Sequence, residues 1–121
     1  MMVAFAGFCA PAQGDVAWRS VRAADLRALF VDHEMADGTH YAYQFRGDGS
    51  FTGVSMGRTV RGVWRIADGE FCWTQKRRAA EEECFEVQRS GDSIRLLRDG
   101  YEALAAKLTP AKLKQELGAP R

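Results

Sequence analysis

Residues 62–73 read GVWRIADGEFCW, and they decide the fold of this 121-residue chain. Asp-Gly between alternating segments is a strong signal for a two-residue hairpin turn, because both central residues must adopt positive φ. Such a turn pairs Ala67 with Glu70. Further along the same two strands it places Trp64 opposite Trp73. Side chains alternate along a strand, so the two indoles share one face of the predicted antiparallel hairpin.

Four more turn signals lie at residues 36–39, 46–50, 89–92 and 98–101. Tight loops at these positions predict four opposed pairs, which are Met35 with His40, Phe45 with Phe51, Val87 with Ile94 and Leu96 with Ala103. In these pairing registers, one face of the sheet is almost entirely apolar. Its residues are Val60, Gly62, Trp64, Ile66, Phe71, Trp73, Phe85, Val87, Ile94, Leu96 and Ala103. Because independent turns place the apolar residues on the same face, the sequence predicts a mainly β fold, a single antiparallel meander of roughly seven to eight strands. The meander forms either a lipocalin-like barrel or a strongly curved sheet.

A short helix is predicted on each side of the meander. The N-terminal helix runs from Ser20, its expected N-cap, to about Phe30, with an apolar stripe of Leu26, Leu29 and Phe30. The C-terminal helix begins at Thr109-Pro110 and ends before Gly118, with Leu113 and Leu117 on its apolar side.

Residues 1–14, MMVAFAGFCAPAQG, carry no charge and end in the small residues Ala12 and Gly14. This pattern predicts a signal peptide cleaved before Asp15, which leaves residues 15–121 as a single β-rich domain in the periplasm or outside the cell. No Lys or Arg stands at the start of the run. Two alternatives therefore stay open, a start codon further upstream or a buried N-terminal strand.

The charges of the chain nearly cancel, with 17 basic and 16 acidic side chains and a net charge of +1. Proteins that bind nucleic acids carry a basic excess that neutralises phosphates. We therefore expect no nucleic-acid partner, although near-neutrality excludes no local charged patch. No apolar run approaches the ~20 residues that cross a bilayer, so we also expect no transmembrane segment.

Two cysteines remain if a signal peptide removes Cys9. An even number of cysteines in a small exported domain is typical of a disulfide. If Phe71 faces Phe85 across the sheet, then Cys72 faces Cys84 directly, within reach of a bridge. Metal ligation and thiol redox chemistry are the alternatives, but the pair lacks the close Cys spacing that both usually have.

Both histidines of the chain lie in the polar segment 31–40, and Asp32 and Glu34 flank the first of them, His33. His33 and His40 could serve a metal-dependent enzyme. The competing interpretation is a short polar edge strand, since the predicted register does not bring the two imidazoles together. We therefore expect no enzyme activity, no metal and no cofactor.

Three regions could bind a ligand or a partner. The rings of Tyr41, Tyr43, Trp64 and Trp73 could line a cavity for a small apolar ligand, or they could simply fill the core. The Lys76–Glu83 tip, or the sheet edge at 31–40, could dock an envelope protein, as in a protein inhibitor or accessory factor. For the tip, the competing interpretation is a solvated turn whose opposite charges discourage edge pairing.

Six short motifs within residues 26–104 together form one pattern. They are GTHYAYQF (38–45), GDGSFTG (47–53), RGVWR (61–65), FCW (71–73), ECFEV (83–87) and IRLLRDG (94–100). The pattern resembles small exported proteins of proteobacteria grouped as domain of unknown function 995, and its most specific part is the Gly-x-Trp strand followed by two spaced cysteines. The resemblance implies an exported, mostly β protein with a Cys72–Cys84 bridge. It brings no activity or ligand, and the uncharged N-terminus departs from a complete signal.

Overall fold

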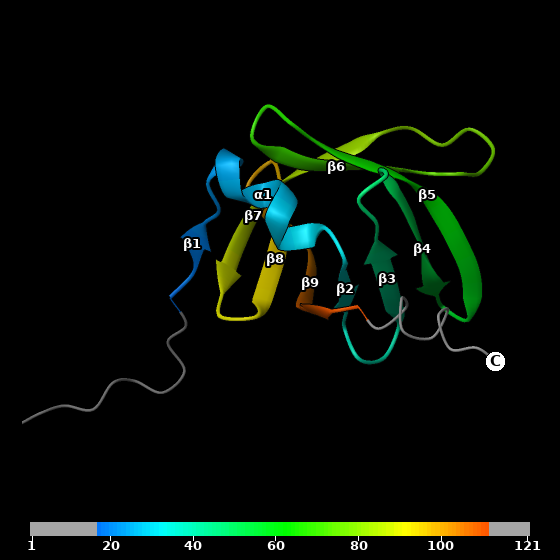
Figure 1. Ribbon diagram of the computed structural model, residues 1–121, viewed down its shortest axis with the longest axis horizontal. Coiled ribbons are helices and arrows are strands. Elements are labelled where there is room, and N and C mark those ends of the chain that lie inside the picture. Colours follow the sequence, from blue (N-terminus) through cyan, green and yellow to red (C-terminus); the bar gives the residue numbers. More distant parts are fainter. Residues whose placement is uncertain (1–16, 112–121) are drawn as a thin grey trace, which may run out of the picture.

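The computed structural model describes residues 17–111, which form nine strands and one helix (Figure 1). The strands are β1 (Arg19–Ser20), β2 (His33–Ala36), β3 (Tyr41–Phe45), β4 (Ser50–Ser55), β5 (Arg58–Ala67), β6 (Glu70–Gln75), β7 (Glu83–Ser90), β8 (Ser93–Arg98) and β9 (Tyr101–Pro110); the helix is α1 (Ala23–Phe30). The predicted signal peptide of residues 1–14 lies outside the described residues.

The strands β2 to β9 form a closed antiparallel barrel. Each strand pairs with the next along the chain, and β9 returns to β2 with Leu108 opposite Met35. This confirms the predicted mainly β meander and decides for the barrel over an open curved sheet. The short β1 is an additional strand that pairs with the second half of β7, beyond the end of β6.

An aromatic core fills the barrel. Its buried members are Leu26, Phe30, Met35, Tyr43, Phe45, Phe51, Trp64, Phe71, Trp73, Phe85, Val87, Ile94, Leu96 and Leu108. Phe45 lies at the centre, with the centroids of five other rings between 5.4 and 6.4 Å from its own. The helix α1 contacts β2, β5 and β6, and its Phe30 stacks on Phe71 at 4.4 Å. The helix therefore covers one end of the barrel.

Two of the predicted hairpins are confirmed in full. The Asp68-Gly69 turn pairs Ala67 with Glu70, and both turn residues have positive φ, 53° and 75°. The three-residue loop at 47–49 places Phe45 opposite Phe51. A further tight turn that the sequence analysis did not identify joins β4 to β5 at Met56-Gly57.

The predicted register of β7 and β8 is wrong by two residues. The turn falls on Gly91-Asp92, so Val87 lies opposite Leu96 and not opposite Ile94. Gly91 adopts a φ of 63° there, and the Arg89 guanidinium donates to its carbonyl oxygen at 3.0 Å. A shift of two residues preserves the side-chain alternation, so Val87, Ile94 and Leu96 still face the core.

A β-bulge contradicts the predicted pairing of Leu96 with Ala103. The Asp99-Gly100 turn forms as expected, but the register shifts between Leu96 and Leu97, and Leu96 pairs with Leu104. The extra residue is Ala103, which is exposed and does not belong to the inner face. The bulge turns Leu104 and Leu108 inward for the rest of β9.

The predicted pairing of Met35 with His40 is also wrong. Met35 lies opposite Tyr43, because the loop at 37–40 is longer than a two-residue turn. The Asp37 carboxylate accepts hydrogen bonds from the backbone N–H groups of Thr39, His40 and Tyr41, at 2.6 to 3.1 Å. These bonds hold the loop residues out of the ladder.

Both predicted helix starts need correction. Ser20 belongs to β1 and is not an N-cap; the helix begins at Ala23, after Arg22, which makes no side-chain cap bond. Thr109 and Pro110 end β9 and do not open a helix, because β9 continues to pair with β2 through Pro110. The remaining C-terminal residues assigned to that helix, with Leu113 and Leu117, lie outside the described residues.

We expect Gly62→Ala to lower the free energy of unfolding by about 1–3 kcal/mol, because the new methyl group would overpack the barrel. A Cβ at this position would overlap the carbonyl oxygen of Thr74 and lie 2.7 Å from a ring carbon of Phe51. Urea unfolding measures the change. The control is Gly47→Ala, whose methyl group would meet only a Val31 carbon at 3.4 Å. Equal stability of the two variants would contradict the prediction.

Candidate binding site

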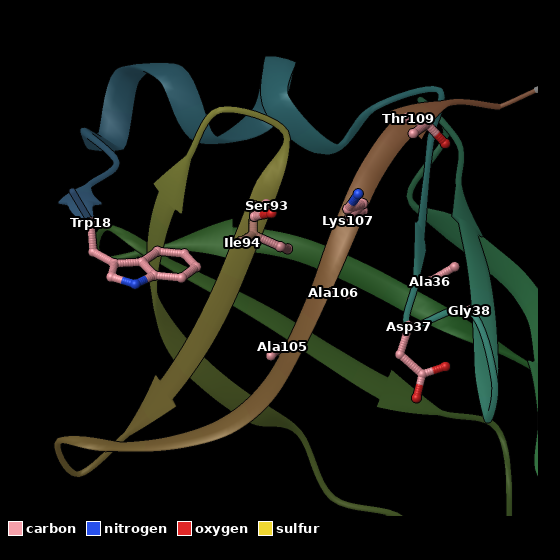
Figure 2. A pocket seen from close by; sticks show the side chains of 10 residues that line it. All are labelled: Trp18, Ala36, Asp37, Gly38, Ser93, Ile94, Ala105, Ala106, Lys107 and Thr109. Carbon is pink, nitrogen blue, oxygen red and sulfur yellow. The ribbon is translucent and has the colours of Figure 1, made fainter. Parts of the chain in front are cut away.

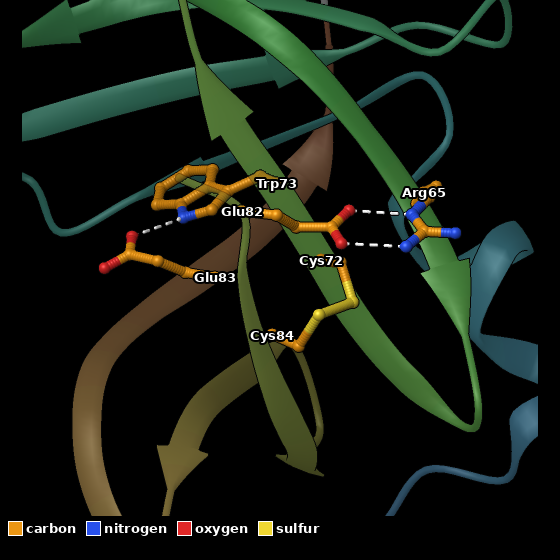
Figure 3. Close-up of a disulfide and its surroundings, with 6 residues drawn as sticks. All are labelled: Arg65, Cys72, Trp73, Glu82, Glu83 and Cys84. Atoms are coloured by element: carbon orange, nitrogen blue, oxygen red, sulfur yellow. Dashed lines mark hydrogen bonds and ion pairs between the residues drawn. A yellow bond between two sulfur atoms is a disulfide. The ribbon is translucent and has the colours of Figure 1, made fainter. Parts of the chain in front are cut away.

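A disulfide between Cys72 and Cys84 joins β6 to β7 (Figure 3). The two Cα atoms lie 4.0 Å apart, and the residues are direct cross-strand partners, as the sequence register predicted. Glu70 lies close enough to form a three-ligand group with the two sulfur atoms. Because the sulfurs are bonded to each other, neither is available as a thiolate ligand.

The acidic end of the Lys76–Glu83 segment is paired with the barrel, not with the basic residues of the segment. Glu82 accepts two hydrogen bonds of 2.7 Å from the Arg65 guanidinium, which lowers the pKa of Glu82 (Figure 3). Glu83 accepts from the Trp73 indole at 3.3 Å and from Arg98 at 3.2 Å. The opposite charges of this segment therefore do not all serve to solvate its turn, because the two acids at its end pair with arginines of β5 and β8.

Removal of the bridge by the double substitution Cys72→Ala/Cys84→Ala should lower the free energy of unfolding by about 3 kcal/mol. The reason is that the bond closes a loop with a sequence separation of 12, which restricts the unfolded chain. Unfolding in urea with and without a reductant measures the effect. The reductant should destabilise the native protein and leave the double variant unchanged; the opposite pattern would contradict a structural role.

Three of the four rings predicted to contact a ligand are buried against other rings. Tyr43, Trp64 and Trp73 are 3–4 % exposed, and the centroids of Tyr43 and Trp73 lie 4.9 Å apart. Trp64 donates its indole N–H to the carbonyl oxygen of Arg46 at 2.9 Å. Tyr41 is half-buried and stacks on Tyr43 at 5.1 Å. Ligand contact by these four residues stays a prediction.

The structure does not bring His33 and His40 together. His33 begins β2, opposite Phe45, and its Nδ1 lies 2.9 Å from the Val31 carbonyl oxygen. His40 lies in the loop beyond the other end of β2, with its Nδ1 2.9 Å from the Asp37 carboxylate. The segment 31–40 is also not a free edge, because β2 is paired on both sides.

The Asp37 loop has an unusual electrostatic environment. Desolvation raises the pKa of Asp37, but the hydrogen bonds from Thr39, Tyr41 and His40 together outweigh it and hold the pKa well below its usual range. Desolvation and the charge of Asp37 raise the pKa of Tyr41 to about 12. Tyr41 is therefore a neutral phenol at physiological pH, and it donates to the Ala105 carbonyl oxygen at 2.9 Å.

We expect the stability advantage of the native protein over Asp37→Asn to shrink as the pH falls below about 4. The pKa of Asp37 is lower in the folded protein than its ordinary value of 3.8, so its charge stabilises the fold above that value and loses this effect as the pH falls towards the folded pKa. Urea unfolding across the acid range measures the difference. Asp99→Asn, on an exposed turn, controls for the change of charge. A difference that does not vary with pH would contradict the prediction.

A groove of about 650 Å³ lies on the outer face of the barrel, over β2, β8 and β9 (Figure 2). The Trp18 indole forms one wall, and the Asp37-Gly38 turn lies at the opposite side (Figure 2). Between them the surface is hollow because Ala36 and Ala105 present only methyl groups. We call this site the Trp18 groove; its polar lining comes from Asp37, Ser93, Lys107 and Thr109.

Neighbouring side chains fix the walls of the Trp18 groove. The Arg95 guanidinium lies 4.5 Å from the centroid of the Trp18 ring, and it also donates to Gln88 at 2.8 Å. Tyr41 anchors the backbone of β9 behind the groove through its bond to Ala105. Trp18 could not be identified as a site residue from the sequence, because a single tryptophan ahead of the helix has no periodic pattern around it.

The chain matches no family model, no curated protein and no solved structure. Membership of the family that the sequence resembles therefore stays a prediction. Within residues 17–111, the structure has no helix of the length and apolarity that crossing a membrane requires. The structure defines the class of this protein as a small, closed antiparallel β-barrel, with a disulfide between β6 and β7 and a hollow on its outer face.

Proposed function

We propose that this protein is an exported, non-enzymatic binding protein that takes a small amphiphilic molecule in the Trp18 groove. The observation that carries the proposal is the groove itself, a hollow of about 650 Å³ with an indole wall and a methyl-lined floor. This volume lies within the range of small-molecule sites, which are mostly apolar with a few fixed polar groups.

The lining specifies the chemistry of the ligand. The Trp18 ring and the alanine methyl groups favour a flat apolar body. Lys107 is exposed and offers a positive charge, and Ser93 and Thr109 offer hydroxyl groups. The Asp37 carboxylate is already occupied by its own loop. A ligand with an apolar ring and a carboxylate or sulfonate group would match these residues.

The interior of the barrel is a weaker candidate for the same ligand. A molecule placed among Tyr43, Trp64 and Trp73 would have to displace rings that already contact each other. Such displacement costs the dispersion contacts and buried area that hold a small domain together. The outer groove requires no such rearrangement.

The disulfide supports the export part of the proposal. Disulfides persist in the periplasm and outside the cell, whereas cytosolic reductants keep most thiols reduced. Cys72 is fully buried at the bridge, as expected for a structural bond. The predicted signal peptide at residues 1–14 points to the same compartment, periplasmic or secreted.

The anionic dye 1-anilinonaphthalene-8-sulfonate is a suitable probe, since it combines a flat apolar body with one sulfonate. We expect Trp18→Ala to weaken its binding about tenfold, and Lys107→Ala to weaken it to a smaller extent. Fluorescence titration measures the affinity, and urea unfolding confirms that each variant folds.

Tyr101→Ala is the matched control, because Tyr101 is an aromatic residue that is 78 % exposed and lies outside the groove. Its dye affinity should equal that of the native protein. Equal affinities for the native protein and Trp18→Ala would contradict the proposal. Native mass spectrometry of protein from the periplasm distinguishes the competing role: a co-purified small molecule supports the groove, and a stoichiometric protein partner would favour an inhibitor or accessory factor acting through the Lys76–Glu83 tip.

A further inference from the structure

A second recess, of about 390 Å³, lies on the outer face of β4, β5 and β6. Two rows of side chains cross the three strands there. In the first row Thr52 lies opposite Arg61. The backbone N–H of Lys76 donates to the backbone carbonyl oxygen of Arg61 at 2.7 Å. This bond places Arg61 and Lys76 side by side on neighbouring strands.

The second row consists of Ser50, Val63 and Thr74. Val63 is 59 % exposed and separates the two hydroxyl-bearing residues. Gly62 contributes only its backbone to the lining between the two rows, since its Cβ direction points inward to the Phe51 ring. The recess therefore presents hydroxyl groups next to a pair of cations.

Directly opposed like charges destabilise a sheet, so the juxtaposition of Arg61 and Lys76 has a cost. Among residues 17–111, no carboxylate forms an ion pair with either side chain. A third cation lies next to them, because the Arg46 guanidinium donates to the Thr52 hydroxyl at 2.9 Å. Two positive groups thus line the recess, and a third contacts one of its lining residues.

The nearby acids do not neutralise these cations. Glu82 and Glu83 pair with Arg65 and Arg98 on other parts of the barrel. The Asp48 carboxylate accepts from the N–H and hydroxyl of Ser50, at 2.8 and 2.6 Å, and offsets only part of the charge of Arg46. The basic run also continues into the exposed residues 77 and 78.

We propose that this recess binds the phosphate group of a small soluble molecule, with Arg61 and Lys76 as the charged contacts. Guanidinium and ammonium groups form short, strong hydrogen bonds with phosphate oxygens, and an arginine fork matches two of them at once. Hydroxyl groups of Thr52 and Thr74 are placed to donate to the remaining oxygens. An anion here would also relieve the repulsion between the two cations.

The same chemistry is present in the headgroups of anionic phospholipids, but two features favour a soluble ligand. The recess is an open hollow of about 390 Å³, a size that suits a small molecule, whereas a flat basic surface would suit a membrane better. The net charge of the chain is only +1, so there is no general attraction to an anionic membrane surface. The recess and the Trp18 groove lie over different strands, so neither ligand proposal depends on the other.

Pyrophosphate is the probe, titrated at low ionic strength into the ¹⁵N-labelled protein. We expect saturable NMR shifts centred on the amides of residues 61, 62, 74 and 76. Arg61→Gln and Lys76→Gln should each weaken binding by about tenfold, the loss expected for one charge-assisted contact. Arg58→Gln is the matched control, since Arg58 lies on the same strand, is exposed and does not line the recess; its affinity should be unchanged.

Stability provides a second readout that a merely structural role would not reproduce. Pyrophosphate should raise the melting temperature of the native protein and of Arg58→Gln, because it binds only the folded state. Without the probe, Arg61→Gln should melt no lower than the native protein, since it removes a like-charge opposition. At the same pyrophosphate concentration, its melting temperature should rise less than that of the native protein, because its affinity is lower.

Three outcomes would overturn the proposal. The first is an equal loss of affinity in Arg58→Gln, which would mean non-specific ionic binding. The second is a melting temperature of Arg61→Gln that falls well below that of the native protein, with unchanged pyrophosphate affinity. The third is binding to vesicles of anionic phospholipid without any binding of pyrophosphate, which would assign the cations to a membrane surface. Vesicle binding that pyrophosphate displaces would support the recess.

Discussion

The barrel depends on its shortest seam, between β6 and β7, where only three residue pairs hold the two strands together. Phe71 and Phe85 form the first pair and face the core, and the disulfide joins the second pair, Cys72 and Cys84. If this seam opened, the aromatic core would be exposed to water at the place where β7 also carries β1 and β8. A covalent bond at this position compensates for the small number of backbone hydrogen bonds.

The aromatic side chains inside the closed barrel also limit where a ligand could bind. An eight-stranded barrel has room for either side chains or one small ligand, and here aromatic side chains occupy the space around Phe45. The two sites proposed for ligands therefore lie on the outer surface, where the structure has hollows. Alanines at 36 and 105 form the floor of the Trp18 groove, and the outward residues of β4 to β6 line the second recess.

The charge distribution is local although the chain is nearly neutral. Glu82 and Glu83 follow the basic residues closely in sequence, but they turn towards Arg65 and Arg98 in the structure. Lys76 is left beside Arg61, on the outer face of the sheet. A net charge of +1 therefore coexists with a locally cationic recess, which the charge total alone does not reveal.

The sequence by itself determined the elements whose signals are local. Period-two alternation and the Asp68-Gly69 turn predicted the β5–β6 hairpin, the inner face around Trp64 and the opposition of Cys72 and Cys84. Only the tertiary structure decided barrel closure, the bulge at Ala103 and the long Asp37 loop, because these depend on contacts between distant strands and on side chains that compete with the backbone ladder. Both candidate sites belong to this second group. Trp18 meets β8 and β9 only after folding, and the proximity of Arg61 and Lys76 depends on how far the β5–β6 pairing extends.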